Sequence, residues 1–244
     1  MSEVPGSEDR PLPGPLIASG RDSDVYAFGP GEKLVLRRSR AGRSMAPEAK
    51  LMEYVRANGY PVPAVDHLDS DGTDLIMERV PGPSMVELIG RKPWTLSANG
   101  ALLGDLHRRL HEIPCPDWLG PGPGPEGSDL LHLDLHPLNV IMGPSGPVVI
   151  DWPNARRGQA AFDVALTWLL LMAGEIPGSR LKAKVMGRFR DRLVASFLHG
   201  FDLAPVRAVM RAVVDWKVTD SHISEAEQRR MQALAASAER AAPA

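Results

Sequence analysis

Three oxygen-bearing side chains near the middle of the chain have the types and the spacing that phosphate chemistry requires. Asp134 precedes Asn139 by five residues and Asp151 follows Asn139 by twelve, so residues 132–139 have the form H-x-D-x-x-x-x-N. In phosphoryl transfer, one carboxylate accepts the proton of the attacking hydroxyl, while an amide oxygen and a second carboxylate hold the magnesium ions that neutralise the triphosphate. Oxygen ligands suit magnesium, which needs only one or two carboxylates. The pattern favours metal-dependent phosphoryl transfer.

Two short apolar runs between Asn139 and Asp151 predict a β-hairpin. Residues 140–142 and 148–150 are apolar, and the turn formers Gly143-Pro144-Ser145-Gly146 separate them. Because a hairpin returns the chain toward its starting point, we expect Asn139 and Asp151 to lie close together.

A buried carboxylate is predicted in the helix of residues 47–57. Glu48 shares a helical face with three apolar residues, so its charge must meet a partner or be costly to bury. These apolar residues are Leu51, Met52 and Val55. Arg37, at the end of the strand-like run from Leu34, is the natural partner, and alternation along that run places Val35 and Arg37 on one face. The alternative is a Glu48 carboxylate that reaches solvent.

The order of the elements predicts an α+β fold in two parts. The first part reads as an antiparallel sheet with one helix. Its predicted elements are strands at 15–19, 25–28, 34–37, 65–68 and 75–78 and the helix at 47–57. Pro81-Gly82-Pro83 reads as a hinge. We therefore expect a loose tail at residues 1–14, an N-terminal part at 15–80 and a C-terminal part at 81–244.

Apolar stripes at helical spacing predict that the C-terminal part is mostly helical. The two clearest stripes are Leu102, Leu103, Leu106 and Leu110, and then Leu181, Val185, Phe189, Leu193 and Phe197. A Pro/Gly-rich loop at 119–127 precedes the predicted hairpin, and the Ala-rich end from residue 225 predicts a final helix.

Composition excludes several classes of protein. The 244 residues carry a formal net charge of -2 and 5% aromatic residues, so neither a nucleic-acid footprint nor stacking platforms stand out. No apolar run is long enough for a membrane span, and the N-terminus lacks the basic start and apolar centre of a signal peptide. The lone Cys115 excludes an internal disulfide. We expect a cytoplasmic protein with no nucleic-acid or membrane partner, and the sequence does not indicate an oligomeric state.

The segment from His132 to Asp151 resembles the catalytic core of the aminoglycoside phosphotransferase and choline kinase-like superfamily. His-Gly-Asp-Leu-His-Pro-x-Asn and a later Ile-Asp-Phe/Trp are typical of that superfamily, and the resemblance covers most of the chain. It implies a bilobal protein-kinase-like fold, with a small antiparallel sheet and one helix in the N-lobe, a mostly helical C-lobe, and ATP (or GTP) and Mg²⁺ bound between the lobes. It also implies Asp134 as the catalytic base and Asn139 and Asp151 as metal ligands.

The same resemblance implies residues that support the catalytic loop. Asp163 stands where the superfamily has an acidic residue that braces this loop, and we expect His132 to support the loop by hydrogen bonding. Leu133 and Leu138 stand where glycine is common in the family. These changes spare all the polar positions.

The N-terminal part resembles the nucleotide-binding half of these kinases. Residues 19–26 resemble the hairpin that covers the nucleotide, which makes Ser23 a candidate cofactor-binding residue. Arg37 stands where the family has a phosphate-binding lysine, and its pairing with Glu48 matches the Lys–Glu ion pair of kinases. Arginine binds phosphate through a flat guanidinium fork, so the geometry of the phosphate contact would differ from that made by lysine. Residues 75–82 resemble the lobe connector, where backbone groups near Glu78 and Val80 would contact adenine.

Other interpretations of the central motif are open. Aspartate and asparagine often only cap turns. His132, Asp134 and His136 alternate, and on a strand they could bind zinc in a metal-dependent hydrolase, although Pro137 favours a loop.

Two further features have alternative interpretations. His107 and His111 have a helical spacing that can bind metal, but no third ligand is near in sequence, and we expect surface histidines. Arg37 in place of lysine, with only one glycine in the covering hairpin, also fits a catalytically weak pseudokinase that binds nucleotide as a regulatory module.

The predicted acceptor is a small hydroxylated or amine-bearing molecule, a metabolite or an antibiotic. The chain runs from Asp151 almost directly into a helix at Ala160, which leaves little room for the activation segment of a protein kinase. Residues 176–244 hold twelve Lys/Arg and seven Asp/Glu, a net charge of +5, which disfavours polycationic aminoglycosides. The sequence does not identify the acceptor.

Overall fold

A computed structural model describes residues 11–173, 180–220 and 223–240, with the side chains of residues 180–186 left outside this description. Residues 1–10 of the predicted tail also fall outside the described residues. The chain divides into two units. The first runs to Gly82 and includes Gly143–Pro153, and the second contains Pro83–Met142 and the chain from Asn154 onward.

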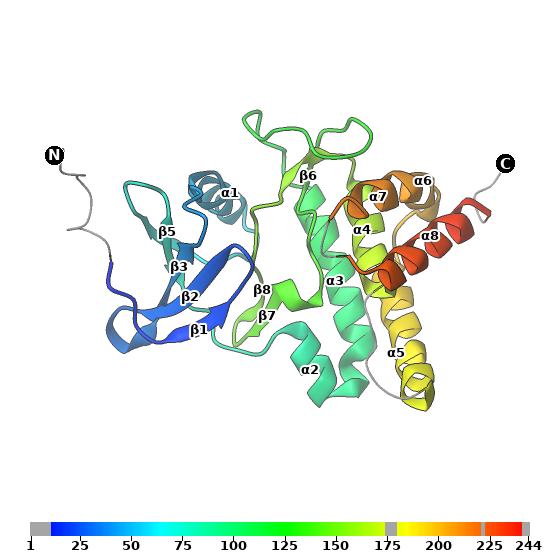
Figure 1. Ribbon diagram of the computed structural model, residues 1–244, viewed down its shortest axis with the longest axis horizontal. Helices are drawn as coiled ribbons and strands as arrows, with labels where there is room; N and C mark the ends of the chain where they lie inside the picture. The colour runs from blue at the N-terminus through cyan, green and yellow to red at the C-terminus, as the bar shows by residue number, and fades with distance from the viewer. Residues whose placement is uncertain (1–10, 174–179, 221–222, 241–244) are drawn as a thin grey trace. The chain divides into compact units, whose positions relative to one another are not determined.

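The first unit is built on a five-stranded antiparallel sheet of order β1-β2-β3-β5-β4 (Figure 1). Its strands are β1 (Leu16–Ser19), β2 (Ser23–Phe28), β3 (Leu34–Ser39), β4 (Val65–Leu68) and β5 (Asp74–Glu78). The 3-10 turn η1 (Pro30–Glu32) and the helix α1 (Ala46–Ala57) complete the N-terminal segment. Every predicted strand and the predicted helix are present, with bounds within about two residues of those expected.

Strand β3 is the centre of this sheet and carries Arg37. Arg37 pairs with Val25 of β2 on one side and with Leu75 of β5 on the other. Leu36 and Leu75 are fully buried, as is Val55 of α1. Burying each such side chain contributes about 1.5–3 kcal/mol, so the strand that bears Arg37 is firmly held.

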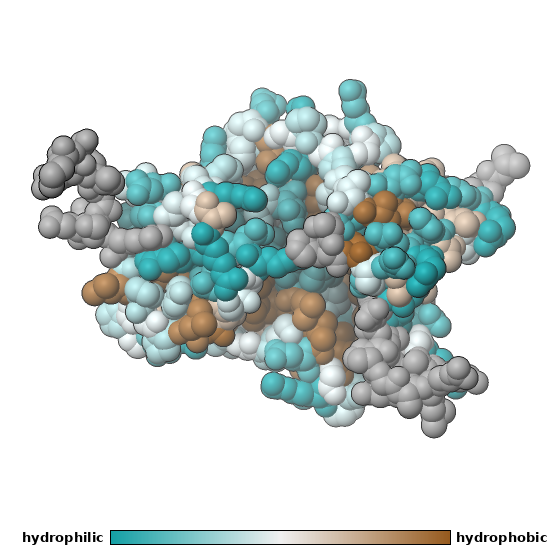
Figure 2. All heavy atoms as spheres, in the orientation of Figure 1, coloured by the Kyte–Doolittle hydropathy of each residue, from teal (hydrophilic) through white to brown (hydrophobic). Residues whose placement is uncertain are grey.

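Strand β1 lies at an edge of the sheet and is exposed along its whole length. Its Leu16 and Ile17, with the preceding Leu12, are among the exposed large hydrophobic residues. Figure 2 shows hydrophobic residues on the surface over β1. An apolar edge strand is a site where another chain could pair.

The second unit is mostly helical, as predicted. Its helices are α2 (Met85–Arg91), α3 (Leu96–His111), α4 (Ala160–Ala173), α5 (Arg180–Leu198), α6 (Leu203–Ala208), α7 (Met210–Lys217) and α8 (Glu225–Arg240), with the 3-10 turns η2 (Pro93–Thr95) and η3 (Pro137–Asn139). Ser84 and Glu87 form a capping box that starts α2. Within the described ranges, none of the helices combines the length and the apolarity needed to cross a bilayer.

Short strands frame the motif of residues 132–139. Strand β6 (Asp129–Leu131) pairs with β9 (Arg156–Gly158), and β7 (Val140–Gly143) and β8 (Gly146–Val149) form the predicted hairpin. The candidate catalytic residues therefore lie in the connection between β6 and β7 and two residues after the end of β8.

Helices α3 and α5 approach each other closely through glycines (Figure 1). A Cβ atom on Gly100 would lie 2.7 Å from the Leu193 carbonyl oxygen, and one on Gly104 would lie 2.6 Å from that of Phe197. Phe197 is fully buried, whereas Phe189 of the same predicted stripe is 39% exposed. The side chains of Leu181 and Val185 fall outside the described residues.

Candidate active site

Arg37 connects three residues of the first unit. Its Nε donates to Ser23 Oγ at 2.8 Å, Nη1 donates to Glu48 Oε1 at 2.5 Å, and Nη2 donates to Asp151 Oδ1 at 3.2 Å. The Arg37–Glu48 ion pair expected from the sequence is therefore present, and it extends to Asp151. A guanidinium group has five N–H donors, so two remain for a ligand. The flat fork of arginine can hold two carboxylates at once, which explains how it can stand where kinases have lysine.

Glu48 is buried and is 5% exposed, which rules out the alternative of a carboxylate that reaches solvent. Its Oε1 also accepts the backbone N–H of Trp152 at 3.2 Å. Burial raises the pKa of Glu48, the Arg37 charge lowers it and the Asp151 charge raises it, and the resulting direction is upward from 4.5. The carboxylates of Glu48 and Asp151 share the single positive charge of Arg37, so these three residues together carry a net negative charge.

Asp151 occupies a left-handed backbone position, with φ of 70°, two residues after the end of β8. Aspartate tolerates this region better than most residues. The side chain is 39% exposed, and only its Oδ1 contacts Arg37. The next residue, Trp152, is buried: its indole N–H donates to the Val149 carbonyl, and its ring packs edge-on against Tyr60 at 5.6 Å. One oxygen of Asp151 therefore has no contact with Arg37, while the buried side chain of Trp152 fixes the backbone that follows Asp151.

Glu78 is the last residue of β5, and Val80 follows it at the start of the predicted connector. The Glu78 N–H donates to the Ala64 carbonyl at 2.8 Å, and the Glu78 carboxylate accepts the Ala64 N–H at 3.1 Å. The amide of Glu78 is therefore already engaged. Val80 has no hydrogen-bonded backbone group among the described residues, so it is the better candidate for adenine.

In the second unit, both carboxylate oxygens of Asp134 are fixed by neighbours in its own loop. His136 Nε2 lies 3.3 Å from Asp134 Oδ1, and Asn139 Nδ2 donates to Asp134 Oδ2 at 3.1 Å. His136 Nδ1 accepts the Leu138 N–H at 3.3 Å, which places the imidazole hydrogen on Nε2, facing Asp134. Since each carboxylate oxygen has a second lone pair, Asp134 can still accept a hydrogen bond from a substrate hydroxyl.

Asp134 is ionised at neutral pH. Burial by itself raises its pKa, but the hydrogen bond and charge of His136 outweigh burial, with smaller contributions from His132 and Lys217, and the pKa lies below its usual range. A carboxylate with a lowered pKa is a weak base that orients a hydroxyl well.

Asp163 of α4 is fully buried and accepts three hydrogen bonds. Its Oδ2 accepts the His132 N–H at 3.0 Å and contacts His111 Nε2 at 3.2 Å, and its Oδ1 accepts the Leu133 N–H at 2.8 Å. Burial raises the pKa of Asp163, but the His111 hydrogen bond and the nearby histidine charges outweigh it and hold the pKa far below its usual range. These contacts are those expected of a residue that braces the loop.

The braced loop contains a strained residue. Leu133 has φ of 60°, a conformation that costs a residue other than glycine about 1–2 kcal/mol. The family's glycine at this position would adopt it freely, whereas Leu133 adopts it with a buried side chain. Leu138, the other residue that replaces a family glycine, is exposed.

The residues present fit a magnesium ion better than zinc. Asn139 directs its Nδ2 to the carbonyl and carboxylate of Asp134, which leaves Oδ1 as its remaining polar atom. Asp151 has one oxygen without a contact to Arg37, and amide and carboxylate oxygens are both hard ligands of the kind that suits magnesium. In the part of the chain that the structure describes, no three His, Cys, Asp or Glu side chains cluster as they would around a metal, so the zinc alternative finds no support.

The expectation of surface histidines on α3 was wrong. His107 is fully buried, with Nδ1 2.9 Å from the Leu103 carbonyl and Nε2 3.0 Å from Thr167 Oγ1, and His111 is nearly as buried against Asp163. Thr167 in turn donates to the Leu135 carbonyl at 2.8 Å. The sequence did contain a signal for buried polar partners. Asp163 and Thr167 are polar residues four apart in the otherwise apolar helix α4, and His107 and His111 are also four apart on α3.

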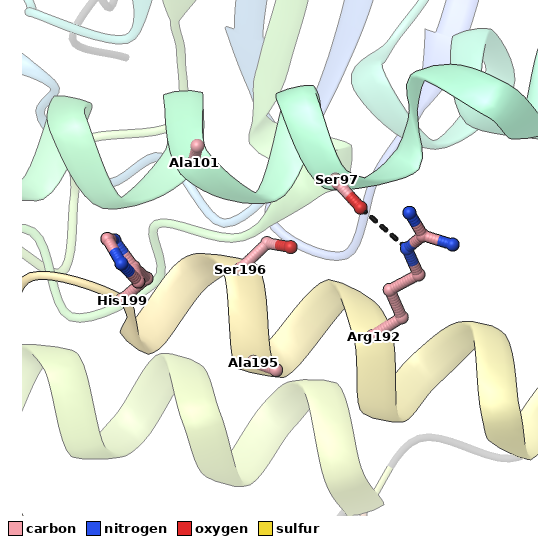
Figure 3. Close-up of a pocket in the computed structure, with 6 residues that line it drawn as sticks. All are labelled: Ser97, Ala101, Arg192, Ala195, Ser196 and His199. Carbon is pink, nitrogen blue, oxygen red and sulfur yellow. Dashed lines mark hydrogen bonds between the residues drawn. The ribbon is translucent and has the colours of Figure 1, made fainter.

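A pocket of about 300 Å³ lies between α3 and α5, apart from these residues. Figure 3 shows Ser97 and Ala101 on α3 opposite Arg192, Ala195 and Ser196 on α5, with His199 after them. Arg192 donates to Ser97 at 2.8 Å. The pocket is shallow and its charged groups are exposed, and none of its lining residues is a predicted site residue.

Comparison with known proteins assigns the reaction class. The sequence matches the model of the phosphotransferase enzyme family over residues 14–127 and 122–213, which is most of the chain. The chain belongs to the phosphotransferase enzyme family. The resemblance noted in the sequence and the prediction of a phosphotransferase are thus confirmed. Among curated proteins, no match was found.

Solved structures of small-molecule kinases share the fold of this enzyme. A thermostable mutant of aminoglycoside phosphotransferase APH(4)-Ia, in complex with ADP and hygromycin B, has a TM-score of 0.64 at 16% identity, covering 94% of each chain. A choline/ethanolamine kinase family protein from Mesorhizobium loti has a TM-score of 0.55 at 15% identity, covering 93% of this chain and 87% of its own. The amicoumacin kinase hAmiN, in complex with AMP-PNP, Ca²⁺ and Ami, has a TM-score of 0.53 at 15% identity, covering 94% and 88%. The predicted α+β protein-kinase-like fold is confirmed.

Proposed function

We propose that this enzyme transfers the γ-phosphate of ATP to a hydroxyl group of a small molecule, with Asp134 as the catalytic base. The observation that carries the proposal is the setting of Asp134: an ionised carboxylate, held through both oxygens, in a loop whose backbone Asp163 braces. Family membership supports the reaction class. Relatives of the same fold solved with ADP or AMP-PNP support ATP as the donor, and GTP is the alternative.

Asp134 acts mainly by positioning. The transition state of phosphoryl transfer is loose, so the attacking hydroxyl needs alignment more than strong deprotonation. His136 and Asn139 fix the carboxylate in one orientation, which favours a single direction of attack. The lowered pKa of Asp134 fits this role, because the carboxylate is then ionised and ready to accept a hydrogen bond throughout the physiological range.

Residues that the sequence singles out would hold the donor. Magnesium, when bound by Asn139 and Asp151, supplies the positive charge that neutralises the phosphates. The two N–H groups that Arg37 does not use in the protein would pair with phosphate oxygens, and Glu48 with Ser23 would keep the guanidinium in place. The backbone of Val80 would contact adenine.

The acceptor is a hydroxylated metabolite or antibiotic that does not carry several positive charges. Relatives of the same fold were solved with hygromycin B or gentamicin, which are small molecules. In this chain, however, residues 176–244 have a net charge of +5, and the charge of Lys217 on α7 acts on Asp134. We expect this net positive charge to repel a polycation.

The test is a screen of pooled metabolites and antibiotics for transfer of labelled γ-phosphate from ATP in the presence of magnesium. Asp134→Asn serves as the blank. We expect it to lower kcat by at least about a hundredfold while the affinity for ATP stays within about twofold, since Asp134 contacts the acceptor.

Asp105→Asn is the matched control, because it makes the same chemical change on an exposed face of α3. Its activity should equal that of the unchanged enzyme. Equal transfer by Asp134→Asn and the unchanged enzyme would refute the base assignment. Tight magnesium-dependent ATP binding without transfer to any acceptor would instead favour the pseudokinase.

A further inference from the structure

Two pairs of buried polar residues join α3 to α4 and end on the backbone of the catalytic loop. His111 contacts Asp163, and His107 contacts Thr167 with 3.0 Å between Nε2 and Oγ1. The partners on each helix are four residues apart, so the two pairs lie one turn apart on facing sides of the helices. Figure 1 shows α3 and α4 side by side.

The pairs His111–Asp163 and His107–Thr167 contact the loop backbone on opposite sides of Asp134 in the sequence. The Asp163 carboxylate accepts the N–H groups of His132 and Leu133, which precede Asp134. The Thr167 hydroxyl donates to the carbonyl of Leu135, which follows it, at 2.8 Å. The backbone is thus held one residue before and one residue after the catalytic carboxylate. Because Leu133 has a φ of 60°, this backbone needs external contacts to keep its conformation.

We propose that Thr167 is a positioning residue that fixes the peptide after Asp134 and thereby orients its carboxylate. The inference rests on the proposed role of Asp134 in phosphoryl transfer. It adds to the brace at Asp163 a second anchor that acts on the other side of the loop.

Burial makes the Thr167 contact hard to replace. Thr167, His107 and Leu135 are all essentially inaccessible to solvent. If the Thr167 hydroxyl were removed, water could not readily take its place at the Leu135 carbonyl, and the His107 imidazole would also lose a partner. Phe197 packs edge-on against the His107 ring at 5.1 Å and keeps it in position.

His107 and the Leu135 carbonyl both lie within hydrogen-bond distance of the Thr167 hydroxyl, which has a single hydrogen to donate. Burial lowers the pKa of His107 to about 4, which leaves one N–H on the ring at neutral pH. Nδ1 lies 2.9 Å from the Leu103 carbonyl oxygen, which can only accept, so this hydrogen is on Nδ1. Nε2 is then an acceptor that competes with the Leu135 carbonyl for the Thr167 hydrogen, and removal of the imidazole would leave that hydrogen to Leu135.

Thr167→Val tests the proposal, because valine has the shape of threonine without the hydroxyl. We expect kcat for the acceptor found by the screen to fall by about 10- to 100-fold, with the KM values for ATP and acceptor unchanged within about twofold. Thr167→Ser restores the hydroxyl and should recover most of kcat. Amide hydrogen exchange in residues 132–136 should speed up in the valine variant and return toward normal in the serine variant.

Two further variants separate positioning from a general loss of stability. Asn99→Ala removes another buried hydrogen bond of α3, from Asn99 to Thr95, that does not reach the loop. It should leave kcat and exchange in residues 132–136 unchanged. His107→Phe keeps a ring against Phe197 and should lower kcat less than Thr167→Val, because Thr167 can still donate to Leu135.

The exchange measurement keeps the proposal testable if the proposed function fails. Should Asp134→Asn leave transfer intact, the assignment of Asp134 falls, while loop exchange in Thr167→Val still reports whether Thr167 anchors the backbone. Unchanged kcat and unchanged loop exchange in Thr167→Val would overturn the proposal. So would an equal fall of kcat in Asn99→Ala.

Discussion

Glu48 in the first unit and Asp163 in the second are both buried carboxylates, yet their pKa values move in opposite directions. Burial raises both. Asp163 accepts two backbone N–H groups and an imidazole, and histidine charges lie nearby. Glu48 has one guanidinium and one backbone N–H, and it shares the guanidinium with Asp151. The number of donors and the presence of a like charge, more than burial itself, decide the direction.

The difference matches two kinds of task. In the Asp163 cluster the carboxylate has three donors, two of which are backbone N–H groups of the loop that carries Asp134, so the cluster serves as a fixed support. The group of Arg37, Glu48 and Asp151 has two carboxylates for one cation, and Asp151 is partly exposed. A divalent cation at Asp151 would relieve the repulsion on Glu48. We therefore expect the first unit to gain stability if a cation binds at Asp151, whereas the Asp163 cluster needs no ligand.

The largest effect is expected from removing the carboxylate of Asp163. Asp163→Ala leaves the N–H groups of His132 and Leu133 and the ring of His111 without their acceptor. We expect the free energy of unfolding to fall by about 3–5 kcal/mol at pH 7, measured by urea denaturation, with loss of transfer activity. A fall below about 1 kcal/mol would show that the loop does not depend on this carboxylate.

The pH dependence of the same variant has a definite sign. Since the folded pKa of Asp163 lies below 3.8, its stabilisation is fully present above pH 3.8 and is lost as pH falls through the lower folded value. The unchanged enzyme should thus lose stability to acid more steeply than Asp163→Ala. Asp117→Ala, at an exposed aspartate of the same unit, is the control and should keep the normal acid profile.

Glu48→Gln should have a smaller effect that depends on pH in the opposite sense. The folded pKa of Glu48 lies above 4.5, so the folded state binds more protons and the stabilising contribution of Glu48 grows as pH falls from neutral toward 4.5. The unchanged enzyme should gain stability relative to Glu48→Gln over this range, by no more than about 1.4 kcal/mol per pH unit. Urea denaturation at pH 7 and pH 5 measures it. A relative loss over the same range would contradict the upward direction of this pKa.

The smallest effect compares two substitutions at Leu133. Both Leu133→Ala and Leu133→Gly lose the buried side chain, but only alanine keeps the strain of a positive φ. Leu133→Gly should therefore be more stable than Leu133→Ala by about 1 kcal/mol, the reverse of the usual order in regular secondary structure. Thermal denaturation of the two variants tests this. If alanine is the more stable, the loop has relaxed out of the left-handed conformation.

The sequence determined the elements and the identities of the charged groups. Alternation and turn residues located the strands of the first unit, because each strand buries one face and its period is visible along the chain. The position of Glu48 on an apolar helical face was enough to predict a buried carboxylate and its partner Arg37, since an unpaired charge is too costly to bury. The spacing of Asp134, Asn139 and Asp151 was enough to indicate phosphoryl transfer.

Only the tertiary structure decided how those groups are held. His107 and His111 looked like surface residues because helical spacing alone does not show which face packs against another helix. Close packing of α3 on α5 through Gly100 and of α3 on α4 turned both histidines inward. The link from His107 through Thr167 to Leu135 joins residues that lie far apart in the chain, so no local pattern reveals it. The direction of each pKa likewise depends on donors from distant segments, which the fold alone brings together.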